Sequence, residues 1–155
     1  MKLHAIAFPA VVLLALSVAV TAAIAQEEKG DWVLPESVTL KVGHRLYPDF
    51  SEEHTVKIGE RFPISDEGYE AMVVKYLPDF AIQIKDGEKK IFSKTSEPNN
   101  PALWIIVYKD SAAVDSVWAF GGKGSPHFTR SSFIYFQILG MKQAEPEGAA
   151  QETQK

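Results

Sequence analysis

The chain has 155 residues, no cysteine and a formal net charge of -4. This length suits a single domain, and the absence of cysteine excludes a fold held together by disulfide bonds. The mild acidic balance, without a clustered stripe of lysine and arginine, argues against nucleic acid and anionic lipid as partners.

The first 25 residues have the pattern of a secretory signal peptide. Lys2 precedes an almost wholly apolar run, and Ala23 and Ala25 offer the small side chains of a cleavage site before Gln26. We therefore expect export, to the periplasm or as a secreted protein, with residues 1–25 removed and no membrane span in the mature chain. The alternative is an uncleaved N-terminal membrane anchor, because the run approaches the ~20 residues that a spanning helix needs.

Two similar segments open the rest of the chain, at residues 39–46 and 55–62. Thr, Lys, Gly and Arg recur at matching places in the two segments. In each, an alternation of apolar and polar residues leads into a glycine, Gly43 or Gly59, which suits the positive φ of a tight turn. We predict a short strand with a turn in each segment, the two paired as a meander or a duplicated β unit.

The middle of the chain carries hairpin signals. Residues 69–77 and 80–85 alternate in the manner of strands, and the dipeptide at 86–87, Asp-Gly, is the strongest hairpin signal in the chain. The return strand is expected over residues 89–93. The segment TSEPNNP at 95–101 is expected to be a loop, because its prolines and asparagines oppose a hydrogen-bonded ladder.

Residues 102–108 are the expected central strand. They are apolar or aromatic without interruption, so both faces of the strand require cover. Turn residues at 109–111 and a return strand at 116–120 complete a β-hairpin. Trp104 and Trp118 are expected to pack in the core, rather than to form a stacking platform for a sugar or haem.

The remaining segments frame one β domain over residues 38–141. A frayed segment at 26–37 precedes it, and a disordered tail at 142–155 follows it, because the tail has no aromatic residue to bury. The loop at 121–132 leads into a last strand at 133–139. Apart from the signal helix, helical periodicity is absent. About seven to nine short strands predict an all-β fold, either a small antiparallel β-sandwich or a partly open barrel.

The glycine-rich loop contains the candidate binding residues Lys123, His127, Phe128 and Arg130. Exposed amides and positive charge between two apolar strands can bind an anion or a partner. The alternative is a plain flexible connection. A nucleotide-binding P-loop does not fit, because Lys123 stands between glycines and a strand, not a helix, follows.

We expect no enzyme, no metal site and no cofactor. The chain has no G-x-S-x-G motif and no cysteine nucleophile, and its neighbouring acidic residues are expected on solvated turns. His44, His54 and His127 stand apart, without the spacing of metal ligands, and are interpreted as ordinary surface histidines.

A set of short motifs extends over much of the mature chain. It comprises YLPDF at 76–80, Ser93, EPNNPA at 97–102 and WAF at 118–120. In these motifs the chain, over about residues 38–139, resembles the extracytoplasmic β region of ResB-like cytochrome c biogenesis proteins. That resemblance implies a β fold and a place near the delivery of haem to apocytochrome c. The chain departs from the family in having no membrane helices after the signal and no membrane-embedded histidines, so no functional residue is carried over.

Two functions from different classes follow. The first is a non-catalytic exported binding or assembly module with a protein partner in the cell envelope, associated with cytochrome c maturation. The second is a stand-alone periplasmic domain that binds an anion or a sugar. The sequence leaves the oligomeric state open.

Overall fold

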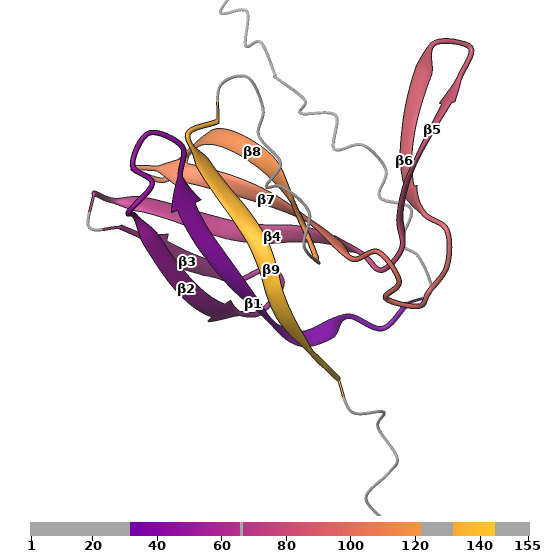
Figure 1. Cartoon of the computed structure of the whole chain (residues 1–155), viewed down its shortest axis with the longest axis horizontal. Coiled ribbons are helices and arrows are strands. Elements are labelled where there is room, and N and C mark those ends of the chain that lie inside the picture. Colours follow the sequence, from indigo (N-terminus) through magenta and orange to yellow (C-terminus); the bar gives the residue numbers. More distant parts are fainter. Residues whose placement is uncertain (1–31, 66, 122–131, 145–155) are drawn as a thin grey trace, which may run out of the picture.

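The computed structural model describes residues 32–65, 67–121 and 132–144 (Figure 1). Within these ranges the chain is all β, with nine strands in three antiparallel sheets, none of them closed into a barrel. The expected signal peptide at 1–25 and the tail from 145 onward lie outside the described residues. None of the described residues belongs to a helix long and apolar enough to cross a membrane.

The first sheet joins the two ends of the described chain. Its order is β2-β1-β9, with β1 at Pro35–His44, β2 at Ser51–Val56 and β9 at Ile134–Gln143. Pro35 is the first residue of β1, a position where a missing N–H is tolerated in a sheet. β1 pairs with β9 over its whole length, so the first and last strands of the described chain lie side by side.

The second sheet has four strands in the order β3-β4-β7-β8. These are β3 at Arg61–Ile64, β4 at Tyr69–Leu77, β7 at Ala102–Lys109 and β8 at Ala112–Phe120. The expected hairpin of residues 102–120 is confirmed as β7 and β8. However, β8 begins at Ala112 and not at 116. Its pairing with β7 shifts register between Val107 and Tyr108, at a bulge, and then continues to Ala112.

The third sheet is a two-stranded hairpin of β5 at Phe80–Lys85 and β6 at Glu88–Ser93, and it projects away from the other two sheets (Figure 1). The predicted Asp-Gly turn is confirmed, since Asp86 and Gly87 have φ values of 52° and 82°. Two consecutive positive φ values are what a type I′ hairpin turn requires.

The core lies between the two larger sheets, which face each other (Figure 1). Alternate residues of the central strands are buried, as the period of two in a strand requires. The core residues include Val38, Leu40, Val42, Val73, Leu103, Ile105, Val107, Val117, Phe136 and Ile138. The expectation that Trp104 and Trp118 belong to this core is wrong, because Leu103, Ile105 and Val107 take the inner face of β7 and leave Trp104 on the outer face.

The predicted pairing of the two repeat segments is confirmed, since Thr39 of β1 lies opposite Thr55 of β2, and so is the turn at Gly59, whose φ is +86°. Two further expectations change. Gly43 is not a turn glycine: it lies inside β1, opposite Tyr135 of β9, and a β-carbon there would collide with the Tyr135 ring. The last strand extends to Gln143, so Lys142 and Gln143 of the expected tail are paired with β1.

Candidate functional site

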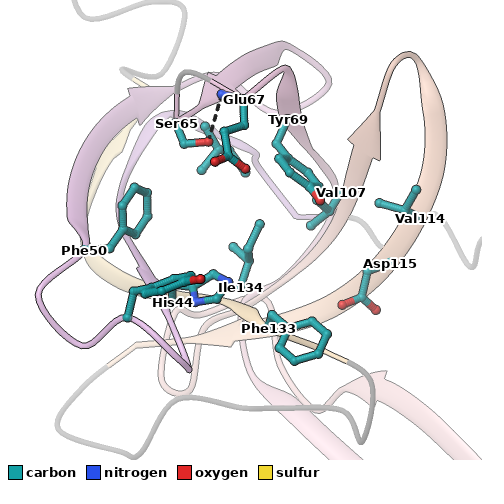
Figure 2. A pocket seen from close by; sticks show the side chains of 12 residues that line it. His44, Phe50, Ser65, Glu67, Tyr69, Val107, Val114, Asp115, Phe133 and Ile134 are labelled. Carbon is teal, nitrogen blue, oxygen red and sulfur yellow. Dashed lines mark hydrogen bonds between the residues drawn. The ribbon is translucent and has the colours of Figure 1, made fainter.

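A pocket of about 560 Å³ opens at one end of the two facing sheets, and we call it the end pocket (Figure 2). It forms where β1, β3 and β7 end and where β4, β8 and β9 begin. Loops and strand ends therefore surround it, which is where binding residues collect on a rigid β scaffold. Its lining residues are His44, Tyr47, Phe50, Ile64, Ser65, Glu67, Tyr69, Val107, Val114, Asp115, Phe133 and Ile134.

Aromatic rings form one wall of the end pocket. The His44 ring lies between Tyr47, 4.7 Å away, and Phe133, 6.1 Å away and nearly parallel. Tyr47 is 66% exposed and Phe133 52% exposed, so both rings offer apolar surface to an incoming group. Exposed aromatic side chains of this kind contribute large contact area at a binding surface.

The orientation of His44 is set by its own loop. The backbone N–H of Leu46 donates to His44 Nδ1 at 3.1 Å, so the neutral ring carries its proton on Nε2. A histidine that ligates haem iron through Nε2 instead donates its Nδ1 proton to an acceptor. Because Nδ1 accepts this bond, His44 does not have the Nδ1–H donor arrangement of an axial haem ligand.

Two carboxylates line the end pocket. Glu67 lies beside Ser65, whose Oγ accepts from the Glu67 N–H at 3.4 Å, and Asp115 contributes to the lining from β8 (Figure 2). Oδ1 of Asp115 accepts from the backbone of Ser116 at 2.8 Å. Among the described residues, neither carboxylate forms an ion pair. The pocket therefore combines apolar walls with negative charge.

Among the described residues, the cationic side chain of Lys109 is held at the rim of the pocket. Lys109 Nζ donates to the backbone carbonyl of Glu67 and lies 4.3 Å from the centroid of the Tyr69 ring. The Lys109 ammonium thus contacts the Glu67 carbonyl and the face of the Tyr69 ring, and it is not paired with the Glu67 carboxylate. His44 is the only basic residue in the described lining.

A second aromatic group lies on the outer face of the four-stranded sheet, and we call it the outer aromatic cluster. The rings of Trp104 and Trp118 are 5.1 Å apart, and Phe80, at the start of β5, packs at 5.1 Å on Trp118 and at 5.0 Å on Phe120. The four side chains are half-buried. They fix the base of the hairpin against the sheet.

The remaining histidine that the structure describes has a structural role. His54 Nε2 lies 3.0 Å from Glu52 Oε2, and the same oxygen accepts from the Ser65 N–H at 3.2 Å. The pair thus joins β2 to the end of β3. Within the described part of the chain, no three potential metal-ligating side chains come together.

The candidate loop residues lie outside the described ranges, at Lys123, His127, Phe128 and Arg130. The end pocket escaped the sequence analysis because its lining comes from separate loops and strand ends, none of which forms a motif. One signal was present: Leu46, Tyr47 and Phe50 are large apolar residues within a loop, where exposed side chains of that kind suggest binding.

Comparisons with known proteins give no match to a family model, to a curated protein or to a solved structure. The resemblance to ResB-like domains therefore rests on the short motifs described above. The function is argued from the end pocket and from the surface of the fold.

Proposed function

We propose that the chain is an exported, non-catalytic binding or assembly domain, in which the two facing sheets serve as a β-sandwich scaffold and the end pocket is the binding site. The observation that carries the proposal is the composition of the pocket. Exposed aromatic rings share one concave surface at the loop end of the fold with two carboxylates, Glu67 and Asp115, which form no ion pair with any described residue. Binding sites are concave and mostly apolar, with a few polar groups that orient the ligand.

The lining selects the chemistry of the ligand. Apolar walls favour an aliphatic or aromatic body, and the carboxylates of Glu67 and Asp115 favour a cationic or hydrogen-donating group beside it. An anion is disfavoured, since His44 is the one basic side chain that the described part of the lining offers it. A partner polypeptide that presents an apolar side chain next to lysine or arginine satisfies both requirements.

The resemblance to ResB-like domains supports a partner within cytochrome c maturation. Because His44 does not fit an axial haem ligand, we propose that the end pocket takes a polypeptide and not haem. Apocytochrome c should then bind the purified domain in a titration, and a soluble amine that occupies the pocket should compete with it. Equal binding of folded holocytochrome c would contradict recognition of an unfolded segment.

A sugar is the second candidate ligand, and the presence of an exposed aromatic ring, Phe133, and a carboxylate, Asp115, in one lining favours it. A sugar ring stacks its apolar face on an aromatic side chain while its hydroxyls donate to carboxylates. The emission of the three tryptophans masks that of Phe133, so fluorescence is not a suitable measurement. Changes in the NMR chemical shifts of the pocket amides on addition of maltose are suitable instead. A response outside the pocket, or none, would eliminate this candidate.

A matched pair of dyes tests the main proposal. Dansylcadaverine and dansylglycine share one apolar fluorophore, but the first carries an amine and the second a carboxylate. We expect dansylcadaverine to bind more tightly, with the preference falling as salt is added, because the pocket charges are partly exposed.

Three variants separate the contributions. Glu67→Gln and Asp115→Asn should each weaken dansylcadaverine binding by about twofold to fivefold, from ~0.5 to 1 kcal/mol per partly exposed charge pair, and should leave dansylglycine binding no weaker. Phe133→Ala should weaken both dyes. Glu60→Gln, in the exposed turn before β3 and outside both the pocket lining and the hairpin, is the control and should change neither. Equal affinity for both dyes in the parent protein would refute the proposed ligand chemistry.

A further inference from the structure

The β5–β6 hairpin and the strand ends that line the end pocket lie at opposite ends of the four-stranded sheet (Figure 1). β4 starts beside the pocket at Tyr69 and runs to the base of the hairpin at Leu77. After the hairpin, β7 returns to the pocket, where Val107 contributes to the lining. The direction of these strands prevents the hairpin of one molecule from reaching its own pocket.

The base of the hairpin is held firmly. The Asp79 N–H donates to Ser93 Oγ at 2.8 Å, and the Lys94 N–H donates to the Asp79 carbonyl at 2.9 Å. Asn100 Nδ2 donates to the Phe80 carbonyl at 3.0 Å, which joins the hairpin to the segment before β7. With Phe80 packed in the outer aromatic cluster, the hairpin projects in a defined direction.

Beyond this base the hairpin exposes apolar side chains. Ile82 is 48% exposed and Ile84 is 74% exposed. The register pairs Ile82 with Ile91 across the two strands, so all three isoleucines share one face. A two-stranded hairpin is at best marginally stable alone in water, and an exposed apolar face of this kind marks a contact surface.

Exposed large apolar residues occur on both surfaces. Tyr47, Val114 and Phe133 line the end pocket, and Ile82 and Ile84 lie on the hairpin. The charges of the two surfaces are opposite. Within the hairpin, Phe80–Ser93, the three lysines Lys85, Lys89 and Lys90 outnumber the two acidic residues Asp86 and Glu88, whereas Glu67 and Asp115 line the pocket.

From this complementarity we propose that the hairpin of one molecule inserts into the end pocket of a second copy of the chain. The inference rests on the proposed role of the pocket and names its partner segment. Ile84 and Ile82 enter between the aromatic rings, and lysines of the tip approach Glu67 and Asp115. The contact joins two different surfaces, so each dimer retains one free hairpin and one free pocket and can grow further or close into a ring.

The test uses two complementary variants of the purified protein in sedimentation velocity. The hairpin variant carries Ile82→Thr and Ile84→Thr, which keep β-branched residues in the strand. The pocket variant carries Glu67→Lys and Phe133→Ser, both at exposed positions. Leu139→Thr removes an exposed apolar side chain elsewhere and serves as the control.

The parent and the Leu139→Thr control should increase in mean mass over a roughly hundredfold range of concentration, whereas each variant alone should remain monomeric. A mixture of the two variants should form dimers and nothing larger, because only one intact hairpin and one intact pocket are available. A mixture that stays monomeric refutes head-to-tail insertion, as does a monomeric parent.

Binding of dansylcadaverine separates failure of this inference from failure of the proposed function. The hairpin variant should bind the dye at least as well as the parent, since its pocket is intact. A parent that binds the dye but never self-associates overturns the inference alone. If the hairpin variant loses its fold, Lys85→Glu with Lys89→Glu replaces it: these substitutions should weaken self-association at least severalfold, and an unchanged association would refute the charge contact.

Discussion

Gly43→Ala should destabilise the protein, although glycine to alanine within a strand ordinarily does the opposite. Gly43 lies in β1 directly opposite Tyr135 of β9, and the ring of Tyr135 lies across it. A β-carbon at position 43 would overlap two ring atoms of Tyr135 and its phenolic oxygen, so the ring must move away from its place against the sheet. Overpacking of this kind costs about 1 to 3 kcal/mol, which exceeds the ~0.5 to 1 kcal/mol gained from lower chain entropy.

Gly140 provides the matched control. Like Gly43, Gly140 lies within a strand, in this case β9. A β-carbon at position 140 meets no atom within 4 Å, so Gly140→Ala should be neutral or stabilise the protein by up to ~1 kcal/mol. Urea unfolding followed by tryptophan fluorescence measures both changes. In a Tyr135→Ala background the effect of Gly43→Ala should reverse in sign, because the obstructing ring is gone. If Gly43→Ala behaves like Gly140→Ala in the parent, the ring moves freely and the packing argument is wrong.

Three further predictions concern the core, a titrating group and the hairpin base. Leu103→Ala should lower the unfolding free energy by about 2 to 5 kcal/mol and Trp104→Ala by less, because only Leu103 is fully buried; equal losses in urea unfolding would contradict this. Burial raises the pKa of Tyr76. Above about pH 10 the unfolded chain therefore loses a proton that the folded chain retains, so stability falls with rising pH, and Tyr76→Phe should reduce that fall in urea titrations at pH ~8 and ~11. Ser93→Ala should cost about 1 to 3 kcal/mol by leaving the Asp79 N–H without its acceptor, which the thermal midpoint will show.

Local patterns predicted most of the strands. The boundaries of β4 and β5 match the alternation of residues 69–77 and 80–85, and the turn at Asp86 and Gly87 has the expected backbone conformation. These features depend on contacts between near neighbours, which are written in the local sequence. The weakly β-forming alanines at the start of β8 carried no such signal, and only pairing with β7 makes them a strand.

Other features depend on residues distant in the chain. The sequence predicted a tight turn at both Gly43 and Gly59. The prediction is correct for Gly59 and wrong for Gly43, because the Tyr135 ring that requires a glycine at position 43 belongs to the last strand, β9. Likewise, β7 is apolar on both faces, so its sequence did not show which face would be buried. The opposing sheet decided it: Leu103 and Ile105 pack inward, and Trp104 is left on the outer face.

The sequence by itself determined an all-β chain, the positions of most strands and the tight Asp-Gly turn, because backbone propensity and side-chain alternation act over a few residues. Only the tertiary structure decided the pairing of β1 with β9, the end pocket and the projection of the β5–β6 hairpin. The pocket exists because strand ends from six parts of the chain meet at one end of two packed sheets. Its aromatic rings and carboxylates become a site through packing, which no local pattern encodes.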